Sequence, residues 1–264
     1  MTTTMTAKKP QFVQTKFSAL VKRHAQPEHT ADPNAVDPVA LLISSFLMYD
    51  APSHMAEAAM QKIRSATVDF NEFRVSLVEE MVQMIGVRYP RAEERCKALR
   101  RVLYDIFRHH HKVSLSHLEG HPKQHIRAYL DNLDGMIAYV SNRVCLLRYG
   151  VHAIPVDQTT HELLIEEGAL SPTVSLSDAA GVLERNIRAG HGLESYFALQ
   201  AAADKRHAAG PKAAPKAVKP EKVGKPEKVG KVEKAAKPAK PASKPSKPAS
   251  GATRTKVVAR TKGR

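Results

Sequence analysis

The carboxylate of Asp157 is the first candidate for chemistry, because of its place in the sequence. It follows Val156 and stands just ahead of Thr159-Thr-His-Glu162, a capping-box pattern that marks the start of a helix. A carboxylate at such a place most often caps the helix by accepting its exposed backbone N–H groups. The helix end also favours the ionised form, and an ionised carboxylate can stabilise a developing cation or activate a water molecule. The residues themselves leave the structural and the catalytic role open.

Two runs of histidine raise the question of a metal site. The runs consist of His109, His110 and His111, and of His117, His121 and His125. Consecutive residues point in different directions on a helix, Gly120 and Pro122 interrupt the second run, and no His-Glu-x-x-His or Cys-x-x-Cys motif accompanies them. The 2 cysteines of the chain are too few for a cysteine-ligated iron–sulfur cluster or a disulfide framework. We therefore expect no metal, no cofactor and a reducing compartment.

A basic stretch precedes these histidines and overlaps the first run, at residues 88–112. It holds eight Lys and Arg side chains against three carboxylates, and Arg100, Arg101 and Arg108 are among them. Such a surface attracts phosphate, which makes these three arginines candidates for contact with a nucleic-acid backbone. The alternative is an ordinary solvated helix face.

The charge of the chain is concentrated at its C-terminal end. The formal net charge of the 264 residues is +15, and residues 211–264 hold 17 Lys and Arg against 3 Asp and Glu, which leaves 24 against 23 for the rest. This segment has no large apolar side chain, so we expect it to be disordered. Its lysines recur every third residue, as at Lys219, Lys222, Lys225 and Lys228, which is the repeat of polyproline II. We expect a polyanion-binding arm rather than a neutral linker.

The elements that must position these residues are helices. Between Asp37 and about Asp204 the apolar residues recur at three- and four-residue spacings, without an alternation long enough for a strand. This pattern predicts an all-α fold. One buried face is expected at Phe73, Leu77, Val78, Met81, Val82 and Ile85, and helices are expected near 90–110, 122–132, 136–149, 159–167, 176–189 and 192–206. No signal-peptide core and no apolar run of 18 residues is present, so we expect a soluble, intracellular protein.

The segment from Leu130 to Asp157 carries a resemblance to a known family. It has the order helix, tight turn, helix, short loop and carboxylate, with Leu133, Gly135, Asn142, Val144, Gly150, Val156 and Asp157 at matching spacings. In this order it resembles the helix-hairpin-helix DNA glycosylases of the endonuclease III superfamily, over about residues 39–168. The C-terminal segment resembles the tails of linker histones.

The resemblance implies roles for individual residues. Asp157 would be the catalytic carboxylate, Tyr139 would line the base pocket, and the hairpin residues Leu133, Gly135, Met136 and Ile137 would contact the DNA backbone. Two departures bear on the activity. Ile137 and Asp134 replace the second glycine and the proline of the family's hairpin, and Tyr139 stands where bifunctional members carry a lysine nucleophile.

Two functions from different classes follow from this resemblance. The first is a DNA glycosylase without lyase activity that hydrolyses the N-glycosidic bond of a flipped base. The second is a non-catalytic chromatin or nucleoid protein that uses the same fold to dock on DNA. In either case we expect a monomer with DNA as its partner, no membrane contact, and association with a nucleoid or nucleus. The expected organisation is an N-terminal extension over 1–36, a glycosylase-like domain over 37–208 and a disordered tail over 209–264.

Overall fold

The chain is described here by a computed structural model, which covers residues 11–25 and 37–209. Within these ranges it consists of α-helices and short 3-10 helices, with no β-strand beyond one isolated bridge between Phe12 and Leu170. The prediction of an all-α fold is therefore confirmed. None of the described helices is long and apolar enough to cross a membrane. The basic tail, including the expected lysine arm, lies outside the described residues.

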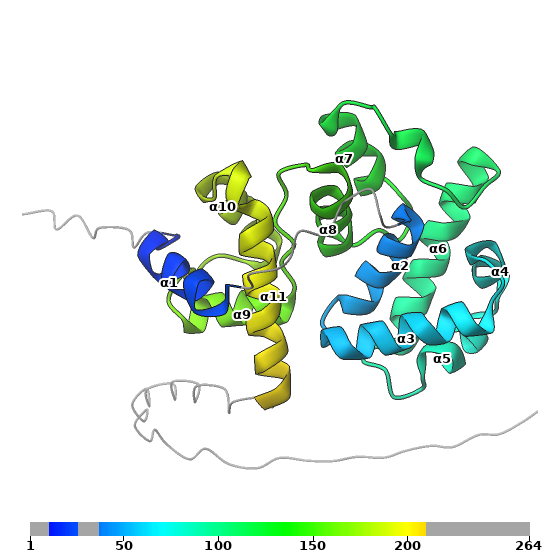
Figure 1. Ribbon diagram of the computed structural model, residues 1–264, viewed down its shortest axis with the longest axis horizontal. Coiled ribbons are helices and arrows are strands. Elements are labelled where there is room, and N and C mark those ends of the chain that lie inside the picture. The colour runs from blue at the N-terminus through cyan, green and yellow to red at the C-terminus, as the bar shows by residue number, and fades with distance from the viewer. Residues whose placement is uncertain (1–10, 26–36, 210–264) are drawn as a thin grey trace, which may run out of the picture. The chain divides into compact units, whose positions relative to one another are not determined.

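The helices follow one another along the chain as Figure 1 shows. They are α1 (Gln14–His24), α2 (Pro38–Met48), α3 (Ser53–Ala66), α4 (Phe70–Val75), α5 (Val78–Ile85), α6 (Ala92–His110), η2 (Ser116–Leu118), α7 (Lys123–Asp131), α8 (Ala138–Tyr149), α9 (Gln158–Glu166), α10 (Leu176–Asn186), η3 (Ala189–His191) and α11 (Gly192–Ala209). The six helices expected between residues 90 and 206 are all present, with ends shifted by at most three residues.

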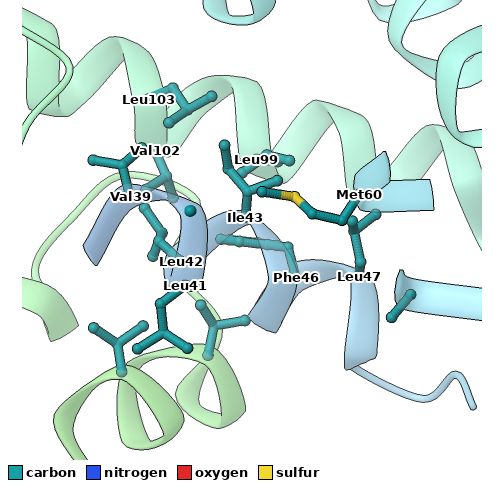
Figure 2. Close-up of a cluster of buried hydrophobic side chains, with 14 of the residues drawn as sticks. Val39, Leu41, Leu42, Ile43, Phe46, Leu47, Met60, Leu99, Val102 and Leu103 are labelled. Atoms are coloured by element: carbon teal, nitrogen blue, oxygen red, sulfur yellow. The ribbon is translucent and has the colours of Figure 1, made fainter. Parts of the chain in front are cut away.

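The first hydrophobic core is built around α2. The Asp37 side chain accepts the N–H of Val39, and Pro38 occupies the first turn, so the helix begins at a well-defined point. Its apolar residues are buried on nearly every side and contact α3, α6 and α8. Figure 2 shows these α2 side chains against Met60 and against three residues of α6, namely Leu99, Val102 and Leu103.

Helix α8 packs against helices of the first core and also against α11. Eight consecutive residues, from Tyr139 to Leu146, are buried, because α8 contacts α2 and α7 on one side and α11 on another. A helix with this degree of burial has no solvent face over most of its length. Tyr139, one of the two residues of greatest interest to the chemistry, is therefore enclosed by neighbouring helices.

The second core is formed by α1, α9, α10 and α11. Its buried side chains include Phe17 and Leu20 of α1, Leu164 of α9, Leu183 of α10 and Leu199 of α11. Helix α1 was not among the helices predicted from the sequence. It contacts α11 and lies within the range 1–36, which was expected to be an extension.

The expectation of one continuous buried face from Phe73 to Ile85 is wrong. The segment forms two helices, α4 and α5, with Ser76 and Leu77 extended between them. Asp69 caps the first helix, and the Glu80 side chain accepts the N–H of Leu77 at the start of the second. Leu77 is consequently 58% exposed rather than buried.

Candidate active site

Asp157 caps helix α9, as its place in the sequence indicated. One carboxylate oxygen accepts the N–H of Thr160 over 2.8 Å, and the other accepts the N–H of Asp50 over 3.2 Å. The residue is 5% exposed. The cap is thus Asp157 itself rather than Thr159, and both of its oxygens face backbone donors.

Asp50 was not singled out in the sequence, yet it lies next to Asp157. It follows α2, with its backbone in the left-handed region at φ +50°. One of its carboxylate oxygens accepts the N–H of Gln158 over 2.9 Å, and the other accepts a guanidinium N–H of Arg91 over 3.2 Å. Burial, and then the nearby charge of Asp157, raise the pKa of the Asp50 carboxyl.

Tyr139 lies in the same region, at the beginning of α8. It is 3% exposed, its hydroxyl donates to the side-chain oxygen of Gln200 over 3.3 Å, and its ring packs on that of Tyr49 with centroids 5.6 Å apart. Burial raises the pKa of Tyr139 well above its usual value, with smaller contributions from Tyr196 and Asp157. The two residues expected to act together are thus both buried, and Tyr139 lies within reach of the charge of Asp157.

A buried arginine next to Tyr139 is a feature that sequence analysis missed. The Arg143 guanidinium donates to the hydroxyl of Tyr196 over 2.6 Å and to the hydroxyl of Ser45 over 2.7 Å. These contacts join α8 to α11 and to α2. The only sequence signal was an arginine inside a run of buried apolar residues.

A small cavity lies between the end of α2 and the start of α8. It has a volume of about 180 Å³ and is lined by Tyr49, Arg91, Glu94, Arg95, Ala98 and Ile137. The ring of Tyr49 therefore lines this cavity and also packs on Tyr139.

The hairpin between α7 and α8 approaches α6 closely. Gly135 has φ +87°, and a Cβ atom there would lie 2.8 Å from the carbonyl oxygen of Ala98. The N–H of Asp134 donates to Asp105 over 3.0 Å, and the Asp134 carboxylate pairs with Arg101. The side-chain hydrogen bond from Arg101, together with its positive charge, lowers the pKa of the Asp134 carboxyl.

The hairpin side chains differ in their exposure. Leu133 is buried in the first core, whereas Met136 and Ile137 are half-buried against it. Any contact that these residues make with a DNA backbone would therefore come mainly from their main chain. The geometry brings the hairpin beside α6.

The three arginines singled out on α6 lie along one groove of about 860 Å³, which also includes Tyr104, Phe107 and Asp134. Arg101 pairs with Asp134, and Arg108 pairs with Asp105 over 2.6 Å. Arg100 stacks over the ring of Tyr104 at 4.9 Å. Two of the three positive charges are thus already offset by carboxylates.

The histidine runs lie at the end of α6 and near the start of α7. The rings of His110 and His117 stack with centroids 3.6 Å apart, and those of His121 and His125 with centroids 4.8 Å apart. Among the described residues, no group of three or more His, Cys, Asp or Glu side chains is arranged to hold a metal ion.

Lys219, Lys222, Lys225 and Lys228, the remaining candidates for contact with DNA, lie outside the described residues. Their role stays a prediction.

Comparison with known proteins shows the fold. No family model and no curated protein matches the sequence. Among solved structures, a trapped endonuclease III–DNA covalent intermediate is similar, with TM-score 0.55, 16% sequence identity, and coverage of 70% of this chain and 82% of that one. A Clostridium acetobutylicum 8-oxoguanine glycosylase/lyase in complex with DNA has TM-score 0.53 and 13% identity over 73% of this chain and 67% of that one. A thermostable thymine-DNA glycosylase has TM-score 0.51 and 14% identity over 71% of this chain and 83% of that one. The chain has the fold of the helix-hairpin-helix DNA glycosylases, as the resemblance in the sequence predicted.

Proposed function

We propose that the protein is a DNA glycosylase without lyase activity. The observation that carries the proposal is the position of Asp157, which begins α9 beside Tyr139 of α8, in a fold whose solved examples include DNA glycosylases bound to DNA. Function is not transferred by fold alone, so the argument depends on this carboxylate.

The reaction that this site would support is hydrolysis. The bond between C1′ of the sugar and the base nitrogen breaks, and the base leaves with the electron pair. Positive charge then develops at C1′, to which the oxygen of a water molecule bonds as the water loses a proton. The Asp157 carboxylate would stabilise the cationic sugar or accept that proton. The base must first be flipped out of the duplex.

The absence of a lysine at position 139 supports hydrolysis over strand cleavage. A Schiff-base mechanism needs an amine to attack C1′, and a buried tyrosine hydroxyl with a raised pKa offers no such amine. Tyr139 would instead form a wall of the base pocket, together with Tyr49.

DNA contact would come from two parts of the chain. The hairpin and the α6 arginines would position the duplex. In the groove along α6, Arg100 stacks on the ring of Tyr104 rather than pairing with a carboxylate of that groove. The basic tail would supply most of the non-specific affinity, because it holds nearly all of the net charge. Association with the DNA of its host would follow.

A specific observation favours a second candidate, the non-catalytic chromatin protein. Asp157 is buried with both oxygens bound to backbone N–H groups, and Tyr49 covers Tyr139. A buried carboxylate whose oxygens are both occupied by main-chain donors can serve a structural role alone. The carboxylate of Asp134 on the hairpin also disfavours close approach of a phosphate.

A panel of duplexes that each carry one damaged or mismatched base separates the two candidates. The glycosylase should release the base and leave an abasic strand that breaks only on alkali treatment. Borohydride trapping of a covalent protein–DNA adduct would contradict the absence of lyase activity. Lack of base release from every duplex, with duplex binding retained, would favour the chromatin protein.

A further inference from the structure

The turn that follows α2 holds Asp50 in a conformation that non-glycine residues seldom adopt. Its φ is +50°, one of three positive values among the described non-glycine residues. Such a backbone persists where its surroundings determine it, and it is often found at functional sites. The neighbouring carbonyl of Tyr49 accepts an N–H of the buried Arg95 guanidinium over 2.7 Å, which fixes the turn from one side.

The other side of the turn is fixed by two hydrogen bonds that run in opposite directions. The N–H of Asp50 donates to Asp157, and the N–H of Gln158 donates to Asp50. Each aspartate thus accepts a main-chain N–H from the other's segment, although the two lie 107 residues apart. We call this reciprocal pair of bonds the aspartate clasp.

The clasp connects the end of α2 with the beginning of α9. The clasp brings two carboxylates close together. Repulsion between them is why the charge of Asp157 helps to raise the pKa of Asp50. Arg91 offsets part of this repulsion through its bond to Asp50, and its guanidinium also lies 5.6 Å from the centre of the Tyr49 ring. The charged groups around Asp50 are thus Asp157, Arg91 and Arg95, with Tyr49 beside them.

A helix cap alone does not require this arrangement. The N–H of Thr160 already satisfies the capping role of Asp157, as the N–H of Glu72 does for Asp69 at α4. The second bond, from Asp50, fixes the remaining oxygen and so defines the plane of the carboxylate. For a carboxylate that must face one atom of a bound nucleotide, loss of this orientation would lower the rate.

We infer that Asp50 is the positioning residue of Asp157, and that its main-chain N–H and its carboxylate together hold the catalytic carboxylate in place. This inference rests on the proposed function. Asp50 does not touch the substrate in this scheme; it acts through Asp157.

Two substitutions at position 50 separate the parts of the clasp. Asparagine tolerates the left-handed backbone, keeps its N–H and can still accept the N–H of Gln158, so Asp50→Asn should preserve the clasp. Alanine has no side-chain acceptor and is strained at φ +50°, so Asp50→Ala should open it. Asp69→Asn is the matched control, because it changes an N-cap aspartate that is not bonded to Asp157.

Amide hydrogen exchange measures the clasp without any assay of activity. In the full-length protein, Asp50→Ala should raise the exchange rate of the Gln158 amide at least tenfold, while Asp50→Asn and Asp69→Asn should leave it within about threefold of the wild type. An unchanged exchange rate of the Gln158 amide in Asp50→Ala would overturn the inference, whatever the result of the activity assay.

Excision kinetics provide the second measurement. On a duplex that the wild type processes, Asp50→Ala should lower kcat at least tenfold with KM changed less than about twofold, and Asp50→Asn should restore most of the rate. Equal kcat in Asp50→Ala and wild type would overturn the positioning role even if the exchange rate rises. If the wild type releases no base from any duplex, the proposed function fails, and the exchange rates alone decide whether Asp50 holds Asp157.

Discussion

The Nε of Arg143 on α8 lies 2.6 Å from the hydroxyl oxygen of Tyr196 on α11, inside the protein. Removing that oxygen leaves a charged donor without its acceptor. We expect Tyr196→Phe to lower the free energy of unfolding by about 1–3 kcal/mol. Denaturant titration of both proteins measures the difference. As a control, Tyr104→Phe removes the hydroxyl of an exposed ring on α6 and should change the free energy of unfolding by less than about 0.5 kcal/mol. A similar loss in both variants would contradict the role of the bond between Arg143 and Tyr196.

The hairpin glycine gives a second prediction about stability. Gly135→Ala would place a Cβ atom 2.8 Å from the Ala98 carbonyl oxygen and would strain a backbone at φ +87°. We expect a loss of roughly 1–3 kcal/mol in the free energy of unfolding. Gly190→Ala is the control, because nothing lies within 4 Å of its Cβ position. If both substitutions had the same effect, the hairpin would not be packed on α6 as described.

The strongest prediction for activity concerns Asp157→Asn. The amide oxygen of asparagine can still accept the N–H of Thr160 and cap α9, whereas its NH2 group cannot accept the N–H of Asp50. Because the cap is kept, the variant should stay folded and bind duplex DNA normally. Loss of the negative charge should reduce base excision at least roughly a hundredfold. Single-turnover excision assays, with Asp37→Asn as a control cap on α2, measure the effect. Full activity in Asp157→Asn would remove this residue from the mechanism.

The raised pKa of Asp50 predicts how stability varies with pH. A carboxyl whose pKa is higher in the folded state binds its proton more tightly there, so the contribution of Asp50 to stability decreases as pH rises through that pKa. Asp50→Asn has no such group. The stability of the variant relative to wild type should therefore increase from about pH 4, near the ordinary pKa of aspartate, towards neutral pH. Urea unfolding of both proteins across this pH range tests the prediction. A constant difference between their free energies of unfolding would contradict it.

Affinity for random duplex DNA should depend mainly on the tail. With roughly ten phosphates neutralised, the slope of log affinity against log salt concentration should be about −9 for the full chain. Truncation after Gly210 leaves 24 basic against 23 acidic residues and should make the slope much shallower. Equal slopes for the two proteins, measured by titration at several salt concentrations, would assign the affinity to the folded part.

The sequence was sufficient for features that depend on local rules. The periodic apolar residues of α6, the turn at Gly135 and the cap at Asp157 all follow from neighbours a few residues away. The joint role of Asp157 and Tyr139 follows only from the family resemblance and stays a prediction.

Features that depend on distant contacts could not be predicted in the same way. Asp50 looked like an ordinary turn residue, because its partners Asp157 and Gln158 are more than a hundred residues away. Helix α1 has its buried residues Phe17, Leu20 and Val21 at helical spacing, but it is only 11 residues long and depends on packing against α11. The contact between the rings of Tyr49 and Tyr139 likewise joins residues that are 90 positions apart in the sequence.

The two cysteines have a practical consequence for experiments on this protein. Cys96 and Cys145 are both buried, and burial raises the pKa of each thiol to about 12. Because the thiolate is the reactive form, neither should react with maleimides at neutral pH while the chain is folded. A single cysteine introduced on the surface, for instance Ala138→Cys at the hairpin, would therefore be labelled selectively with a fluorophore. Quenching of that dye by DNA would report docking of the hairpin in real time, with no need to remove the native thiols.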